Sequence, residues 1–257
     1  MSNQDSQAQD LQTPNLNATE ERREELDARL SAVRERITKA TQAAGRTEEP
    51  TLIVVTKFFP PSDAAALYDL GMRDMGENRE QEATPKAAAL SEYAPDLRWH
   101  FIGQLQSNKV NRVVRYAHEI HSVDRASLVK ALARAGQRRA DEGLDPLGCY
   151  VQVDVRESQP DDGRGGVSIN GAQAVADSIA ESPGLALRGV MTVAPLNEDP
   201  AAAFERLGEL SHRIRQTHPQ ATGISAGMSH DLEQAIAAGA THLRIGSDVL
   251  GSRPAVG

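Results

Sequence analysis

The feature that most constrains the fold is a regular alternation of short β-like runs with helical patterns from residue 51 onward. Eight runs are predicted as strands, at residues 51–56, 73–76, 97–102, 119–123, 149–155, 186–193, 223–225 and 242–245. Helical patterns follow them, at 62–70, 79–91, 108–117, 125–142, 171–181, 200–217 and 229–238. Such alternation indicates parallel βαβ units, and a count of eight favours a closed barrel over an open doubly wound sheet. We therefore predict an α/β fold, a single-domain TIM (β/α)8 barrel, in which the second strand is the weakest by propensity.

The segment before the barrel divides into two parts. Residues 1–17 are rich in Gln, Asn, Ser and Asp and have little apolar surface to bury, so a disordered tail is predicted. An extra N-terminal helix is predicted over 18–45, with Leu26, Leu30, Val33 and Ile37 on one face. Because this stripe is short for a coiled coil, we expect it to pack against the barrel, which is predicted to span 51–253.

Composition narrows the class of protein. The net charge of −8 argues against a general nucleic-acid binder, which shows a basic excess or stripe. The single cysteine, Cys149, lies in an apolar run, which indicates a buried thiol and excludes a disulfide within the chain. No secretory signal and no apolar run of membrane-spanning length is found in the sequence, so a cytoplasmic protein is expected.

The first predicted strand ends on Lys57, before a Phe-Phe-Pro-Pro break. A lysine at the end of a buried strand costs free energy unless the site uses its amine, although a side chain that emerges into solvent also explains it. Lys57 is the only one of the five lysines that we place at a strand end, and the other 23 basic residues are arginines. Only lysine forms a Schiff base, so Lys57 is a candidate for covalent chemistry.

The carboxyl ends of the strands form the active site in barrels of this type, and here nearly all of these ends carry polar residues or glycine. Phosphate frequently binds to the loops after strands seven and eight. These loops read Ser225-Ala-Gly-Met-Ser229 and Gly246-Ser247, with glycine for close backbone approach and hydroxyl groups to donate. Capping serines beside flexible glycines explain either loop alone, but the two loops together favour an anion site.

Arg244 lies in the last predicted strand, two residues before Gly246 and therefore on the same face. An arginine that points into the mouth of a barrel needs a partner. A Schiff-base lysine, two phosphate-binding loops and an arginine that faces the ring are together the parts of a site for pyridoxal 5'-phosphate (PLP).

Several motifs closely resemble those of the pyridoxal phosphate homeostasis proteins (the YggS/PROSC group). They are Thr56-Lys57, Gly76-Glu-Asn78, Trp99-His-Phe-Ile-Gly-Gln-Leu-Gln-Ser-Asn-Lys109, His121-Ser-Val-Asp124, Gly189-Val-Met191, Ser225-Ala-Gly-Met-Ser-His-Asp231 and Arg244-Ile-Gly-Ser247. The resemblance extends from about residue 20 to Arg253, and the run that begins at Trp99 is highly specific. It implies a barrel similar to the N-terminal domain of alanine racemase.

The resemblance also implies roles for individual residues. PLP would be bound as a Schiff base to Lys57, with Arg244 facing the ring nitrogen. The other cofactor-binding residues would be Ser225, Gly227, Gly246 and Ser247 at the phosphate, Asn78 beside the cofactor, and Met191 at the end of the sixth predicted strand. Members of the group are regarded as PLP carriers or buffers without an established turnover, and PLP-dependent apo-enzymes are their expected partners.

Two features depart from the pattern of the group. The segment from Asp154 to Gly166 lacks the Ser-Lys-Ser-Gly sequence of many relatives, so a role for a second lysine is not carried over. Ser247 stands where threonine is frequent, which preserves the hydroxyl group.

The main competing hypothesis is a PLP-dependent amino-acid racemase of the alanine-racemase type. By resemblance, such racemases take a tyrosine from a C-terminal β-domain of the partner subunit, and this sequence shows no such domain. The four tyrosines, Tyr68, Tyr93, Tyr116 and Tyr150, are predicted in helices or in the body of strand five. An arginine at the ring nitrogen also disfavours a protonated pyridinium, which weakens the electron sink, although racemases work with this arrangement. We therefore predict a non-catalytic PLP-binding protein, and a monomer because the racemase dimer interface is missing.

A third hypothesis is a phosphate-metabolite enzyme or a metal enzyme. His118 and His121 are three residues apart near a strand and are expected to face opposite sides. His100 and His242 occur singly within strands, so the histidines show no metal-ligand spacing and we expect no metal. No nucleophile-elbow sequence supports a Ser/His/Asp hydrolase.

Overall fold

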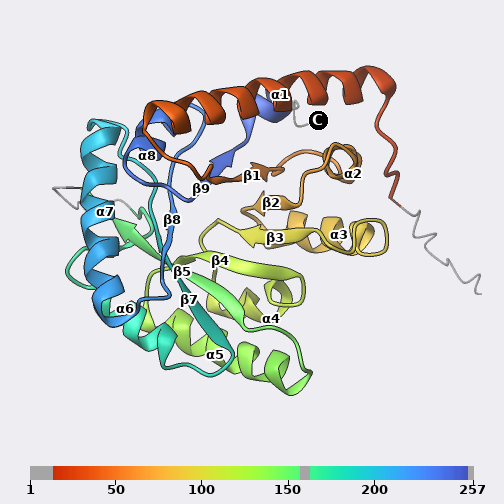
Figure 1. Ribbon diagram of the computed structural model, residues 1–257. Coiled ribbons are helices and arrows are strands. Elements are labelled where there is room, and N and C mark those ends of the chain that lie inside the picture. The colour runs from red at the N-terminus through yellow and green to blue at the C-terminus, as the bar shows by residue number, and fades with distance from the viewer. Residues whose placement is uncertain (1–13, 157–162, 254–257) are drawn as a thin grey trace, which may run out of the picture.

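A closed ring of parallel strands forms the centre of the molecule (Figure 1). The computed structural model describes residues 14–156 and 163–253. In this part of the chain the ring contains β1 (Thr51–Val55), β2 (Asp74–Glu77), β3 (Arg98–Phe101), β4 (Ala117–Val123), β5 (Leu147–Asp154), β7 (Leu185–Met191), β8 (Gly223–Ser225) and β9 (His242–Ile245). Each strand pairs with the next in this order, and pairing of β9 with β1 closes the ring. The predicted TIM (β/α)8 barrel is confirmed.

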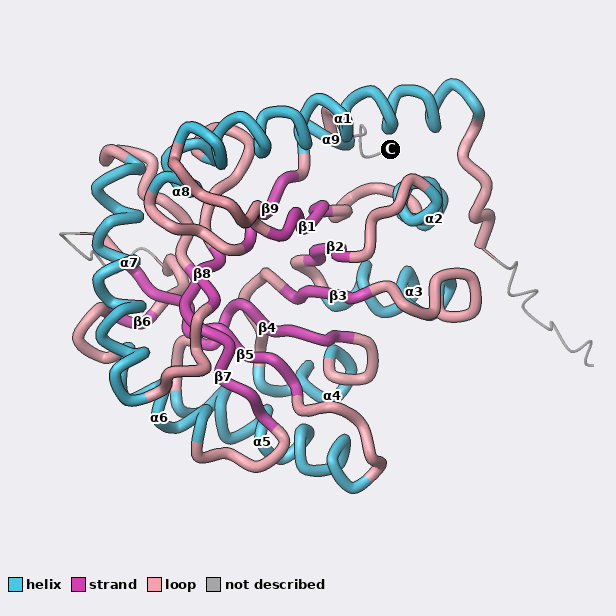
Figure 2. Tube along the Cα trace, in the orientation of Figure 1, coloured by secondary structure: helices cyan, strands magenta, loops and turns pink. Residues whose placement is uncertain are grey.

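Helices surround the barrel on its outer side (Figure 2). They are α2 (Pro61–Asp69), α3 (Glu80–Leu90), α4 (Val110–Val113), α5 (Ala126–Asp141), α6 (Ala172–Ala180), α7 (Pro200–Thr217), α8 (Leu232–Ala237) and α9 (Ser247–Leu250), with the 3-10 turn η1 (Ser107–Lys109) before α4. Proline opens α2 and α7, where its fixed φ suits the first turn and its missing N–H removes no helical bond.

The prediction of one helix over 108–117 is wrong. The helical turns end at Val113, and β4 begins at Ala117, two residues earlier than predicted. Pairing of Ala117 with Trp99 in the neighbouring strand extends the chain there, so sheet register overrides the helical pattern. A two-residue strand that was not predicted, β6 (Val167–Ser168), pairs with the end of β5 outside the ring.

The N-terminal helix α1 (Glu20–Ala43) lies along the side of the barrel near β1 and β9, next to α8 and α9 (Figure 1). Thr19 caps it, since its hydroxyl accepts a hydrogen bond from the Arg22 N–H. The predicted stripe, Leu26, Leu30, Val33 and Ile37, is buried as expected. Of the predicted tail, residues 1–13 lie outside the described residues, and Leu16 packs partly buried against the core.

The apolar core lies between the strands and the helices. In β9, Leu243 and Ile245 belong to this core, and Arg244 between them faces into the barrel, where it reaches Ser225 of β8. Cys149 is fully buried in β5 as predicted, and burial raises the pKa of its thiol. Within the described residues no helix is both long and apolar enough to cross a membrane.

The interior of the barrel is polar over much of its length, whereas such barrels are usually filled by Val, Ile and Leu. The polar side chains that contact one another inside it are Asp74, His100, Glu119, His121, Tyr150, Ser225, His242 and Arg244. Tyr150 stacks on His121 with 4.3 Å between ring centroids. Gly223 makes room for Tyr150, because a Cβ at this position would lie 2.6 Å from Cε1 of its ring.

Replacement of Leu30 by alanine tests how much α1 contributes to stability. Leu30 is fully buried against the barrel, so Leu30→Ala is expected to lower the free energy of unfolding by about 2–5 kcal/mol. Urea unfolding followed by circular dichroism measures this. Ser31→Ala, at the exposed neighbouring position, is the matched control, and equal effects of the two substitutions would contradict the packing of α1.

Candidate functional site

The residues predicted for the site come from the carboxyl ends of five barrel strands. Lys57 follows β1, Asn78 follows β2, Met191 ends β7, Ser225 ends β8, and Gly246 follows β9. Because all these strands are parallel and close into one ring, their carboxyl ends lie at the same mouth of the barrel. Lys57 is half-buried there and Met191 is fully buried.

The residue before Lys57 is anchored by a buried ion pair. Lys86 on α3 donates from Nζ to the Thr56 carbonyl oxygen at 2.7 Å and lies 2.5 Å from the Glu77 carboxylate. The Thr56 hydroxyl donates to the same carboxylate at 2.7 Å. All three residues are at most 4% exposed. Burial raises the pKa of Glu77, and the adjacent Lys86 opposes that rise.

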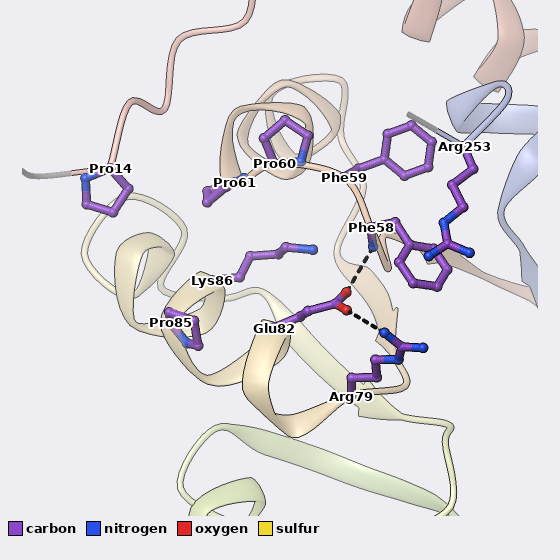
Figure 3. Close-up of a pocket in the computed structure, with 10 residues that line it drawn as sticks. All are labelled: Pro14, Phe58, Phe59, Pro60, Pro61, Arg79, Glu82, Pro85, Lys86 and Arg253. Carbon is purple, nitrogen blue, oxygen red and sulfur yellow. Dashed lines mark hydrogen bonds and ion pairs between the residues drawn. The ribbon is translucent and has the colours of Figure 1, made fainter. Parts of the chain in front are cut away.

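The residue after Lys57 is held in an unusual backbone conformation. Phe58 has φ of 71°, in the left-handed region that residues with a Cβ rarely adopt. Its N–H donates to the Glu82 carboxylate at 3.1 Å, and Arg253 lies 3.6 Å from its ring centroid (Figure 3). Phe58 lines a cavity of about 600 Å³ with Arg79, Glu82 and Arg253. Lys57 is therefore fixed by anchored neighbours on both sides.

Arg244 is 4% exposed and is held at both terminal nitrogens of its guanidinium group. Nη1 donates to the Ser225 hydroxyl at 2.6 Å, and Nη2 donates to the Thr192 carbonyl oxygen at 2.7 Å. Burial lowers the pKa of Arg244 to about 10, which still leaves it a cation at neutral pH. The site thus has a fixed positive charge beneath its mouth.

The loops after β8 and β9 meet, as the predicted anion site requires. The hydroxyl groups of Ser229 and Ser247 are 3.2 Å apart. Gly227 has φ of +93°, and a Cβ there would lie 2.6 Å from the Ala235 Cβ, so the first loop needs glycine. The Ser225 hydroxyl is buried and contacts both Arg244 and His121, so it can donate to a phosphate only when its hydrogen is not shared with His121. Ser229 and Ser247 also offer hydroxyl groups to an anion at these loops.

Asn78 provides a test of whether the site fits a ligand. Its Oδ1 atom is buried and has no hydrogen-bond partner among the described residues. Because a buried polar atom without a partner costs free energy, an acceptor left open at the mouth of the barrel fits a bound molecule that donates to it. The fixed lysine, the buried cation and the two hydroxyl-bearing loops fit PLP in the same way.

The histidines lie closer together than their sequence spacing indicates. Nδ1 of His100, Nε2 of His121 and a carboxylate oxygen of Glu119 all lie within 4.8 Å of one another, so the expectation of no metal-ligand arrangement is wrong in geometry. The two rings instead make a direct hydrogen bond of 3.0 Å. Their other nitrogens contact Asp74 at 2.8 Å and Ser225 at 2.9 Å, which accounts for all four ring nitrogens without an ion.

The tyrosines lie away from the strand ends. Tyr68 is in α2, and Tyr150 is in the middle of β5. Tyr93 and Tyr116 are in turns rather than in helices, which corrects the prediction for these two. In the described part of the chain, none of the four follows the carboxyl end of a barrel strand.

Sequence reasoning missed two groups of residues that support the site. Lys86 and Glu77 anchor Thr56, and His100 and His121 support Ser225. The one available signal for Lys86 was its place in the apolar stripe of α3, between Ala83 and Leu90. A charged residue in such a stripe needs a buried partner.

Residues 28–254 match the family described as "Alanine racemase, N-terminal domain". A pyridoxal phosphate homeostasis protein of Mycobacterium tuberculosis is 42% identical over an alignment of 255 residues, and the match covers 93% of this chain and 96% of the relative. The Escherichia coli protein of the same name is 34% identical over 229 residues, with 87% and 95% covered.

Solved structures agree with these matches. PipY of Synechococcus elongatus, with PLP bound, is 30% identical at a TM-score of 0.75, and the match covers 88% of this chain and 100% of PipY. Alanine racemase of Streptomyces coelicolor is 17% identical at a TM-score of 0.69, with 88% of this chain and 58% of the racemase covered. The similarity to this alanine racemase shows a shared fold.

The buried ion pair gives a prediction about stability. Lys86→Met leaves Glu77 buried without its cation and is expected to lower the free energy of unfolding by about 3–5 kcal/mol. The double variant Glu77→Gln with Lys86→Met removes both charges and is expected to recover much of this loss. Urea unfolding at neutral pH compares them. Equal losses in the single and double variants would show that the charge pair is not the cause.

His121 gives a prediction about pH. Burial lowers its pKa to about 3, whereas in the unfolded chain it titrates near its ordinary 6.5. The stability from its neutral ring is therefore complete above pH 6.5 and is lost as pH falls toward 3. The slope from this group is up to about 1.4 kcal/mol per pH unit.

Urea unfolding between about pH 4.5 and 6.5 measures that slope. His121→Phe is expected to give a flatter dependence than the unsubstituted protein. Some slope remains, because burial also lowers the pKa of His118 and of His242. An equally steep dependence in the variant would contradict a buried neutral His121.

Proposed function

Because the chain belongs to the family of pyridoxal phosphate homeostasis proteins, we propose that it binds PLP and holds it as a Schiff base on Lys57. The amine of Lys57 condenses with the aldehyde of PLP, and one water leaves. The observation that carries this proposal is the fixed position of Lys57 at the barrel mouth. Thr56 before it is anchored by Lys86 and Glu77, and Phe58 after it by Glu82.

The remaining parts of the site support binding of the other groups of PLP. Ser229 and Ser247 offer hydroxyl donors for the phosphate, and Gly227 and Gly246 allow close approach of the backbone. Arg244 presents a buried cation for the ring nitrogen. Asn78 offers an acceptor beside Lys57, and Met191 contributes apolar surface at the end of β7.

The site is better suited to holding PLP than to turning over a substrate. A guanidinium at the ring nitrogen disfavours its protonation, because two positive charges would face each other. PLP with an unprotonated ring withdraws electrons less strongly from a bound substrate. In the described residues no tyrosine lies at the mouth to act as a second acid or base. The proposed role is therefore PLP homeostasis, with PLP-dependent apo-enzymes as the recipients.

The cytoplasmic location and the monomeric state stay predictions. Size-exclusion chromatography with light scattering measures the state of association of the purified protein. Exchange of the α-hydrogen of amino acids for deuterium tests the racemase hypothesis, and clear exchange in the loaded protein would overturn the proposed non-catalytic role.

Lys57→Ala tests the covalent site. The purified protein is expected to absorb in the visible, and borohydride reduction followed by peptide mass mapping is expected to place the pyridoxyl group on Lys57. Lys57→Ala should lose the band and the label without unfolding, since this residue is outside the apolar core. Lys130→Ala, an exposed lysine of α5, is the matched control and should keep both. A label on another lysine, such as Lys86, would contradict the assignment.

A further inference from the structure

A continuous row of hydrogen bonds crosses the interior of the barrel and ends at Arg244. From the far end, Asp74 Oδ1 contacts His100 Nε2 at 2.8 Å, and His100 Nδ1 contacts His121 Nε2 at 3.0 Å. His121 Nδ1 then contacts the Ser225 hydroxyl at 2.9 Å, which accepts from Arg244 at 2.6 Å. Every member of this row, called here the interior chain, is at most 7% exposed.

The two ends of the interior chain lie at opposite ends of the barrel. Ser225 ends β8 at the mouth that carries Lys57. Asp74 begins β2 and lines a cavity of about 410 Å³ with Arg98 and His242, which begin β3 and β9. This cavity therefore lies at the amino ends of the strands, and exposed residues such as His118 border it. The interior chain thus joins a polar cavity at one end of the barrel to the candidate site at the other.

The chemistry of the two ends fixes the direction of the hydrogen bonds. Arginine can only donate, and an ionised carboxylate can only accept. Burial alone would raise the pKa of Asp74, but hydrogen bonds from His100 and Arg98 lower it to about 2. With both imidazoles neutral, Arg244 donates to Ser225, Ser225 to His121 Nδ1, His121 Nε2 to His100, and His100 Nε2 to Asp74. Each contact then holds one hydrogen, and both rings carry it on Nε2.

A second arrangement exists when His100 is protonated. Its two N–H groups then donate to Asp74 and toward His121, with a Glu119 carboxylate oxygen 3.3 Å from Nδ1. His121 must accept at Nε2 and carry its hydrogen on Nδ1, which now donates to Ser225. The hydroxyl hydrogen of Ser225 is thereby released from His121. Protonation at the amino end thus frees a donor at the carboxyl end.

A proton can pass between the two arrangements without any other reactant. When a proton reaches the Ser225 oxygen, that oxygen gives its own hydrogen to His121 Nδ1. His121 then gives its Nε2 hydrogen to His100 Nδ1. Ser225 again holds one hydrogen, His121 is neutral, and His100 is an imidazolium between Asp74 and Glu119. The reverse sequence returns the proton to the carboxyl end.

The charges around the two rings favour His100 as the place where the proton rests. Burial lowers the pKa of His100, but Asp74 and Glu119 more than offset this, so it lies above the ordinary value. For His121 burial prevails and the pKa is lowered to about 3. The titratable and charged groups that face the rings or line the adjoining cavity are Asp74 of β2, Arg98 of β3, His118 and Glu119 of β4, Arg139 of α5, Tyr150 of β5, Arg188 of β7, and His242 and Arg244 of β9.

We propose that the interior chain links PLP binding at the mouth to protonation of His100 at the opposite end of the barrel. This inference rests on the proposed binding of PLP beside Arg244. His100 and His121 are positioning residues: they act through Ser225 on Arg244 and on the hydroxyl that can donate to the anionic cofactor. Binding therefore tightens when His100 is protonated, and by linkage bound PLP favours the protonated form of His100 to the same degree.

The dissociation constant of PLP, measured from about pH 5.5 to 8.5, tests this link. The readout is the dissociation constant of the His121→Phe variant divided by that of the unsubstituted protein, because pH effects common to both proteins cancel in this ratio. This ratio is expected to rise at least about fivefold as pH falls. His212→Gln, at an exposed position of α7 outside the interior chain and the cavity, should give a ratio independent of pH. A ratio for His121→Phe that is also constant would overturn the proposal.

Nitrogen NMR of the imidazoles in the unsubstituted protein tests the same link without a variant that could misfold. Loading with PLP should raise the pKa of His100 by about the logarithm of the factor by which the ratio of dissociation constants changes with pH. An unchanged pKa would overturn the proposal. If borohydride reduction finds no PLP on Lys57, the proposed function fails. NMR of the ligand-free protein then still tests whether the interior chain works as proposed. His121 must move its hydrogen from Nε2 to Nδ1 as His100 is protonated. An unchanged tautomer, or stoichiometric zinc on the two rings, would overturn it.

Discussion

The buried guanidinium of Arg244 is the constraint on which the inside of this barrel depends. A cation that is 4% exposed needs its donors satisfied, since an unpaired buried charge costs several kcal/mol. Ser225 and Thr192 accept from it, and Ser225 in turn needs His121. His121 is itself polar and needs His100 as a hydrogen-bond partner, and His100 needs the carboxylate of Asp74. The series of polar partners ends there. The polar residues inside the barrel thus satisfy one another, and most of the apolar core lies between the strands and the helices. Ile53, which pairs with Arg244, adds a buried apolar side chain to the interior.

The same reasoning applies to the loop that carries Lys57. A buried pair such as Lys86 with Glu77 contributes little net stability compared with apolar residues of the same size. Its effect is on geometry, because it fixes the Thr56 carbonyl from the side of α3. Phe58 is likewise kept in a strained conformation by its neighbours. The buried ion pair and the strained Phe58 backbone both have an energetic cost. Both restrict the position of Lys57 between them, whose amine must approach an aldehyde from a defined direction in the proposed function.

The parts of the fold that the sequence predicted are those with a local cause. Alternating runs marked the eight barrel strands, and the spacing of Leu26, Leu30, Val33 and Ile37 marked the buried face of α1. The interior chain has no local cause: His121 and Ser225 are 104 positions apart and meet only because the ring closes in one register. The irregular pairing of β4 with β5 after Ile120 also affects which side chains point inward. For that reason the sequence spacing sets His121 beside His118 and leaves His100 single, and it does not indicate the contact of His121 with Ser225.

A protein that stores PLP must also release it, and the arrangement of this barrel bears on how it does so. Lys57 is half-buried at the mouth and not enclosed, whereas enzymes that stabilise carbanions exclude water from the reacting centre. In the proposed role, a recipient enzyme would approach the same mouth and cover it. A change in protonation at the opposite end is not blocked by such a partner, because the amino-end cavity faces away from the mouth. The interior chain can therefore act on a site whose own entrance is occupied, which a titrating group at the mouth could not do.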